Sequence, residues 1–75
     1  MKKKEVDNIK KGDLIAMDHD LIYLVTGIDR GAAYQFSTFP LQEWQQKNGI
    51  YRWSSYQFLN KDWRILVKAN AQPSI

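Results

Sequence analysis

The chain has 75 residues, enough for one domain, and a domain of this size buries only about 60% of the surface that its unfolded chain exposes. Three Trp, four Tyr and three Phe provide for a dense apolar core, while the lack of cysteine excludes disulfides and thiolate metal sites. The formal net charge of +3 is mild, and the whole excess lies after Ser37, where five basic residues stand against two acidic ones. This asymmetry hints at a binding face in the second half of the chain.

The N-terminal segment is strongly charged. Only Val6 and Ile9 among its first eleven residues are suited to packing, so residues 1–8 are expected to form a flexible leader whose end docks on the domain. The basic start is not followed by the apolar stretch of a signal peptide. The longest apolar run, Leu21 to Val25, is far shorter than the ~20 residues of a membrane helix. These features predict a cytoplasmic protein.

The stretch from Gly12 to Phe36 predicts three short strands joined by two tight turns. The turn residues are Asp18-His19-Asp20 and Asp29-Arg30-Gly31, with Gly31 expected at the positive φ that a tight hairpin demands. The middle strand is apolar on both faces, which predicts a central strand, or one whose outer face is covered by another element or a second copy of the chain. The three strands are expected at Leu14–Met17, Leu21–Ile28 and Ala33–Phe39.

The second half predicts a helix, a strand, a single helical turn and a last strand. Pro40 fits a first helical turn and Asn48-Gly49 fits a left-handed C-cap, while Leu41 and Trp44 share a face that is expected to seal one end of the domain. Phe58 or Leu59 is expected to point inward from the helical turn. The later elements are expected at Ile50–Ser54, Tyr56–Asn60 and Trp63–Lys68, followed by a loose tail over residues 69–75.

This mainly β pattern, with five short strands, a short helix before the fourth and a one-turn helix before the fifth, resembles an SH3-like small β-barrel. The resemblance covers roughly residues 9–68. It implies an architecture and no single activity, and it suggests an accessory protein of a phage, plasmid or mobile cassette. It is carried by Lys11-Gly12-Asp13-Leu14-Ile15, by Tyr23-Leu24-Val25-Thr26-Gly27-Ile28, and by Phe58-Leu59 with Trp63-Arg64-Ile65-Leu66.

Catalysis is poorly supported by the sequence. His19 is the sole histidine, and no serine stands in a nucleophile elbow. The glycines match neither a dinucleotide fingerprint nor a P-loop, and Asp18-His19-Asp20 is interpreted as a polar turn. Plasmid-type dihydrofolate reductases are SH3-like chains of similar length, but the nearest strand here, Gly49–Trp53, lacks the glutamine of their pore segment. The prediction is a non-catalytic protein with no metal, cofactor or small-molecule ligand.

Two kinds of binding stay open. The favoured one is binding of a protein partner or of a second copy through exposed aromatic residues, since exposed aromatic patches mark interfaces. The alternative is a nucleic-acid face on the last two strands, taken to be neighbours, where basic side chains would meet phosphates. The candidate protein interface is Trp44, Tyr51 and Tyr56, and the candidate nucleic-acid face is Arg52, Arg64, Lys68, Lys61 and Lys47.

Overall fold

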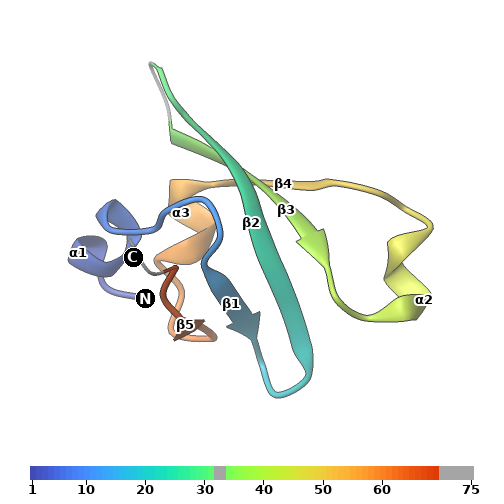
Figure 1. The fold of residues 1–75 in the computed structure, drawn as a ribbon. Coiled ribbons are helices and arrows are strands. Elements are labelled where there is room, and N and C mark those ends of the chain that lie inside the picture. The colour runs from blue at the N-terminus through green and yellow to red at the C-terminus, as the bar shows by residue number, and fades with distance from the viewer. Residues whose placement is uncertain (32–33, 70–75) are drawn as a thin grey trace, which may run out of the picture.

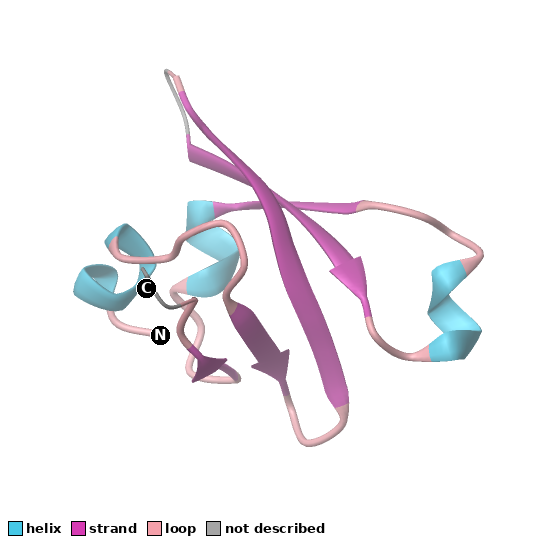
Figure 2. Cartoon of the chain, in the orientation of Figure 1, coloured by secondary structure: helices cyan, strands magenta, loops and turns pink. Residues whose placement is uncertain are grey.

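The computed structural model describes residues 1–31 and 34–69 of the chain. Five strands and three short helices follow one another (Figures 1 and 2). None of the described helices is long and apolar enough to cross a membrane. In chain order the elements are α1 (Lys3–Asp7), β1 (Leu14–Met17), β2 (Leu21–Arg30), β3 (Tyr34–Pro40), α2 (Glu43–Gln46), β4 (Tyr51–Ser54), α3 (Ser55–Phe58) and β5 (Trp63–Val67).

The strands form one antiparallel sheet in the order β4-β3-β2-β1-β5. The predicted mainly β fold is confirmed, with five strands and a short helix before each of β4 and β5. Two details differ from the prediction. Within the described residues the sheet is not closed into a barrel, and β4 and β5 are its two edges rather than neighbours. The doubly apolar β2 is central, as predicted.

The two hairpins differ in how their turns form. Between β1 and β2, Asp18 takes a φ of 57°, and its N–H donates to the carbonyl of Asp62 at 3.0 Å. After β2, the N–H of Gly31 donates to the Asp29 carboxylate at 3.1 Å, and the φ of Gly31 is not positive. The prediction of a positive φ at Gly31 was therefore wrong: β2 continues to Arg30, and Gly31 bonds to the side chain of Asp29. The predicted start of the third strand, Ala33, lies outside the described residues.

Aromatic rings fill the inner side of the sheet. The ring of Tyr23 on β2 lies 5.7 Å from that of Tyr51, 5.6 Å from that of Trp53 and 5.7 Å from that of Trp63, measured between centroids. Trp53 on β4 and Trp63 on β5 are themselves 4.9 Å apart. The two edge strands therefore meet through their inner side chains, so the sheet curves around this core.

The short helix α3 places one side chain, that of Phe58, in this core. Phe58 is fully buried, with its ring 4.9 Å from Phe36 and 4.8 Å from Trp63. Leu59, the other residue expected to point inward, is exposed. The start of the helix is held by the Gln57 side chain, which accepts a hydrogen bond from the N–H of Ser54 at 2.8 Å.

The N-terminal segment differs from the predicted flexible leader. Residues Lys3–Asp7 form helix α1, and the Glu5 carboxylate accepts a hydrogen bond from the N–H of Lys2 at 2.8 Å. Met1, Val6 and Ile9 are buried and belong to the core cluster. The leader was expected because most of its residues are charged, yet Met1 before α1, Val6 within it and Ile9 after it all reach the core cluster. The wider division into residues 1–8, 9–68 and 69–75 stays a prediction.

Helix α2 turns a glutamine inward rather than its tryptophan. Gln45 is 6% exposed, and its amide donates to the hydroxyl of Tyr23 at 3.2 Å. Gln42 donates to Gln45 at 2.7 Å and accepts from the N–H of Ile22 at 2.6 Å, so this amide chain ties α2 to the sheet. Leu41 and Trp44 are exposed and do not seal the end of the domain, contrary to the prediction.

Candidate functional site

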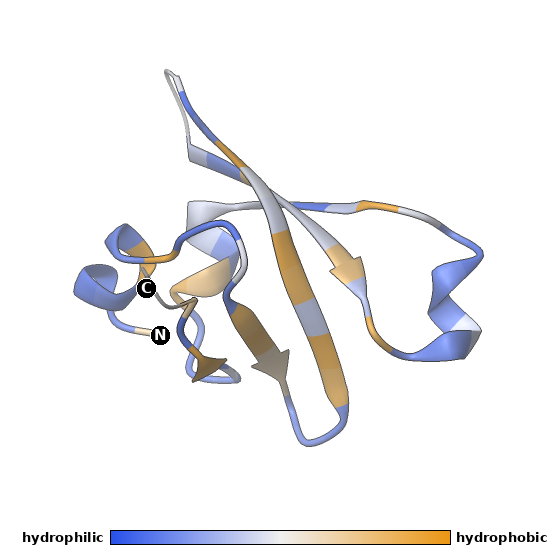
Figure 3. Ribbon diagram, viewed as in Figure 1, coloured by the Kyte–Doolittle hydropathy of each residue, from blue (hydrophilic) through white to orange (hydrophobic). Residues whose placement is uncertain are grey.

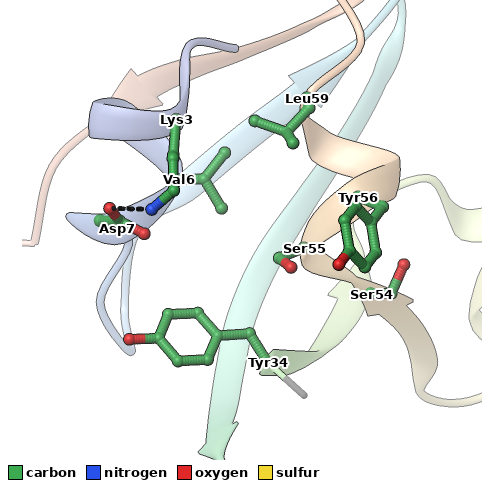
Figure 4. Close-up of a pocket in the computed structure, with 8 residues that line it drawn as sticks. All are labelled: Lys3, Val6, Asp7, Tyr34, Ser54, Ser55, Tyr56 and Leu59. Carbon is green, nitrogen blue, oxygen red and sulfur yellow. Dashed lines mark hydrogen bonds and ion pairs between the residues drawn. The ribbon is translucent and has the colours of Figure 1, made fainter.

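A groove of about 340 Å³ opens between α1 and α3 (Figure 4). Val6 of α1 and Leu59, the residue that follows α3, approach each other, and Tyr34 enters from the start of β3. The side chain of Tyr56 stands at the α3 side and is 79% exposed. We call this feature the α1–α3 groove; its lining residues are Lys3, Val6, Asp7, Tyr34, Ser54, Ser55, Tyr56 and Leu59.

The core fixes both walls of the groove. Phe58 is anchored among buried rings, and Tyr56, two positions earlier on α3, therefore points to another side of the helix. On the opposite wall, buried Val6 holds α1 in place. Both walls thus carry exposed side chains on a backbone that buried neighbours keep rigid, which lowers the entropy lost when a ligand binds.

The groove is nearly neutral. Lys3 and Asp7 form an ion pair at 3.0 Å on the exposed side of α1, so the two charges compensate each other. The Arg30 guanidinium lies 5.0 Å from the ring centroid of Tyr34 and donates to its hydroxyl at 3.4 Å. Tyrosine and serine hydroxyls can donate to carbonyls or accept from amides. The site therefore combines an apolar floor with uncharged hydrogen-bonding groups.

The three residues of the predicted protein interface do not form one patch. Trp44 and Tyr56 are 65% and 79% exposed. They lie on helices at opposite ends of β4, since α2 precedes that strand and α3 follows it (Figure 1). Tyr51 is half-buried, with its ring stacked on Trp53 at 6.1 Å and its hydroxyl accepting from Asn48 at 2.9 Å. Of the three, only Tyr56 lines the α1–α3 groove.

The predicted basic face depends on β4 and β5 being neighbours, and that premise is wrong. Arg52 is exposed on β4, at one edge of the sheet. Arg64 lies on β5, at the other edge, and Lys68 comes directly after β5. Three strands separate the two edges. Arg64 donates to the carbonyl of Asp18. Lys47 follows α2, far along the chain from β5. The five basic residues therefore do not gather on one surface.

Lys68 instead bonds to a buried carboxylate, that of Asp13. We call Asp13 and its three donor residues, Lys10, Lys68 and Ala69, the clasp. Asp13 is fully buried and accepts hydrogen bonds from Lys68 Nζ at 2.6 Å, from the N–H of Ala69 at 2.7 Å and from the N–H of Lys10 at 2.8 Å. Burial by itself raises the pKa of Asp13, but the Ala69 and Lys10 N–H groups and the Lys68 ammonium outweigh it and hold the pKa below its ordinary value of 3.8. This clasp joins the N-terminal segment to the chain after β5.

Two of the predicted basic residues do line a second hollow, of about 310 Å³, beside the first. Lys61 and Arg64 are joined there by Lys2, and Glu5 and the buried Trp63 also line the hollow. Leu59 lines both hollows and separates them. This second hollow is the only one of the two with an excess of positive charge.

The Asp18-His19-Asp20 turn is exposed throughout. In residues 1–31 and 34–69 no three His, Asp or Glu side chains come together in a way that could hold a metal ion. Nothing in the turn distinguishes it from the polar β-turn that the sequence predicted.

The α1 wall of the groove was not found from the sequence. Lys3, Val6 and Asp7 all lie in the segment that was interpreted as a leader. Two signals were available: Glu5 three residues after Lys2, which resembles half of a capping box, and the spacing of Val6 and Ile9, which is that of one helix face.

Comparison of the chain with protein-family models, with curated proteins and with solved structures finds no match. The functional argument therefore rests on the geometry of the α1–α3 groove and of the sheet.

Proposed function

We propose that this chain is a non-catalytic binding module that holds an extended segment of a partner protein in the α1–α3 groove. The observation that carries the proposal is the exposure of Tyr56, 79%, above a groove whose walls are fixed by buried neighbours. Tyrosine is enriched at protein interfaces because its ring is apolar and its hydroxyl is polar. An exposed tyrosine on a rigid helix suits this use.

The chemistry of the groove favours a peptide over an anion. The Lys3–Asp7 pair leaves the groove almost without net charge, and hydroxyl groups are the natural partners of backbone carbonyls and amides. Leu59, which is 43% exposed, offers an apolar surface for an aliphatic side chain, while Val6 beside it is almost completely buried. We therefore expect the bound segment to be uncharged, extended and partly apolar.

The wider proposal keeps the SH3-like interpretation. The 4.9 Å contact between Trp53 on one edge strand and Trp63 on the other supports a sheet rolled toward a small barrel. With this architecture we propose an accessory protein of a phage or mobile element, in which one small domain modifies the behaviour of a larger partner.

The test uses two matched aromatic variants. Proteins retained by the immobilised wild-type chain are purified, and their direct binding to wild type, Tyr56→Ala and Trp44→Ala is measured by calorimetry. Truncating a central interface tyrosine costs roughly 2 kcal/mol, so Tyr56→Ala is expected to weaken binding roughly thirtyfold. Trp44→Ala, at another exposed aromatic site, on α2, is expected to bind like wild type. Equal binding by Tyr56→Ala, or no retained protein, contradicts the proposal.

Nucleic-acid binding is a second candidate, favoured by the second hollow. Lys2, Lys61 and Arg64 line it, against the single carboxylate of Glu5. If these three side chains meet phosphates, the logarithm of affinity for a random single strand falls with the logarithm of salt concentration with a slope of about −2. Lys61→Ala is then expected to reduce that slope by roughly 0.7. Absence of binding at low salt rejects this function.

A further inference from the structure

The outer face of the sheet carries an apolar row that crosses β5, β1, β2 and β3 and ends one residue before β4. Strand register places Leu14 beside Leu24, and Leu24 beside Phe39. Val67 lies on the other side of Leu14, next to the register shift in β5. Ile50 continues the row, since it comes one position before β4 and therefore one step beyond the last residue pair of β3 and β4. We call these five residues the outer row.

No described helix covers the outer row. The residues that flank Leu24 on β2, Tyr23 and Val25, are buried on the inner side, where the helices contribute Val6 and Phe58 to the same core cluster. Leu24 itself is only half-buried, and the ends of the row, Val67 and Ile50, are 55% and 50% exposed. Figure 3 shows the apolar stretch of β2 with no other element drawn across it.

We infer that the outer row is the contact between two copies of this chain, packed sheet against sheet. A second copy fits because a two-fold interface sets a surface against itself, and the row contains no charged side chain that would meet its own like charge. Two antiparallel sheets with apolar inner faces are a standard packing. The inference goes beyond the proposed function, because it concerns another face and another partner.

The charges around the row are also compatible with a two-fold pair. Arg52 lies opposite Ser37 on the β4 edge, while Arg64 lies opposite Ala16 on the β5 edge. They stand on opposite sides of the row as well as on opposite edges. A two-fold axis that runs along β2, or across it within the interface, therefore places neither arginine against its own copy nor against the other arginine.

The size of the face sets the expected strength. Five strands at a spacing of about 4.8 Å make a face roughly 20 Å wide, so we expect a small interface, at the low end of the specific range. We expect a dissociation constant on the order of 10–100 µM. Each copy carries a net charge of +3, so screening by salt is expected to strengthen the dimer. Phosphate binding has the opposite salt dependence.

Sedimentation equilibrium of the full chain tests the inference, over about 10 µM to 1 mM protein and at two salt concentrations. The variants Val67→Lys and Ile50→Lys place a charge at opposite ends of the outer row, at sites exposed enough to leave the fold intact. Leu59→Lys adds the same charge on the groove side, at a leucine that is 43% exposed, and is the matched control. Circular dichroism verifies that each variant is folded.

The expected result is a monomer–dimer equilibrium for wild type and Leu59→Lys, strengthened by salt, and at least tenfold weaker association for both row variants. A wild-type chain that is monomeric throughout overturns the inference, as do row variants that associate like wild type. These outcomes leave the proposed function standing, because binding of a partner in the groove is measured separately and depends on Tyr56.

Discussion

Replacing Phe58 with alanine is expected to lower the free energy of unfolding by about 3–5 kcal/mol. Phe58 is fully buried. The centroid of its ring lies 4.9 Å from that of Phe36, 4.8 Å from that of Trp63 and 6.3 Å from that of Trp53. A chain of 75 residues has a total stability of only about 4–11 kcal/mol, so this loss consumes much or all of it. Urea unfolding followed by tryptophan fluorescence measures the change.

Leu59→Ala is the control for this prediction. Leu59 is the next residue along the chain and is 43% exposed, so its truncation removes little buried surface and is expected to cost less than about 1 kcal/mol. Equal losses for the two variants would show that α3 does not anchor the core through Phe58.

Asp13→Asn is expected to cost about 3 kcal/mol at pH 7. The substitution keeps the size of the side chain but removes the negative charge that Lys68 pairs with at 2.6 Å, and it places an amide nitrogen against either the N–H of Lys10 or the N–H of Ala69. Urea unfolding again provides the measurement. Asp7→Asn, which breaks an exposed ion pair, is the control and is expected to cost less than about 0.5 kcal/mol.

The same carboxylate predicts an acid transition. Because the pKa of Asp13 is lower in the folded chain than its ordinary value of 3.8, its contribution to stability is complete above that pH. The contribution is lost as the pH falls below 3.8 toward the folded pKa, since the unfolded chain then binds more protons. Asp13→Asn is expected to lack this part of the pH dependence. If the free energy of unfolding of the variant falls with acid as steeply as that of wild type, the proposed role of Asp13 is contradicted.

The strands could be predicted because their signal is local. A short apolar run bounded by turn residues marks β1 at Leu14–Met17, where prediction and structure agree, and apolar residues on both faces mark β2 as the central strand. Strand order carries no such local signal. β5 joins β1 across nearly fifty residues of sequence, so the incorrect pairing of β4 with β5 could not be detected from the pattern of either strand.

Helix α2 was misinterpreted for a different reason. Apolarity favoured Trp44 as the inward residue, but Gln45 takes that place because the Tyr23 hydroxyl and Gln42 satisfy its amide. A buried polar side chain becomes acceptable only when its partners are in place, and those partners come from another part of the chain. The burial of Asp13 could not be predicted for the same reason, because two of its hydrogen-bond donors, Lys68 and Ala69, follow β5.

One wall of the candidate site could be predicted from the sequence and the other could not. Tyr56 was singled out because a small core cannot enclose every ring, and it is the most exposed of the large apolar and aromatic residues described. The opposite wall of the groove was not predicted, because α1 has only five residues and four of them are charged. Such a helix is stabilised by packing rather than by its own sequence.

The most direct measurement of the groove proposal is amide NMR of the labelled chain titrated with its purified partner. The proposal predicts that the shift changes cluster on α1, on Tyr34 and on Ser55–Phe58, the segments that line the α1–α3 groove. Little change is expected at Arg52 and Trp44. Changes that concentrate on the β4 edge or on α2 and spare α1 and α3 would contradict the proposal.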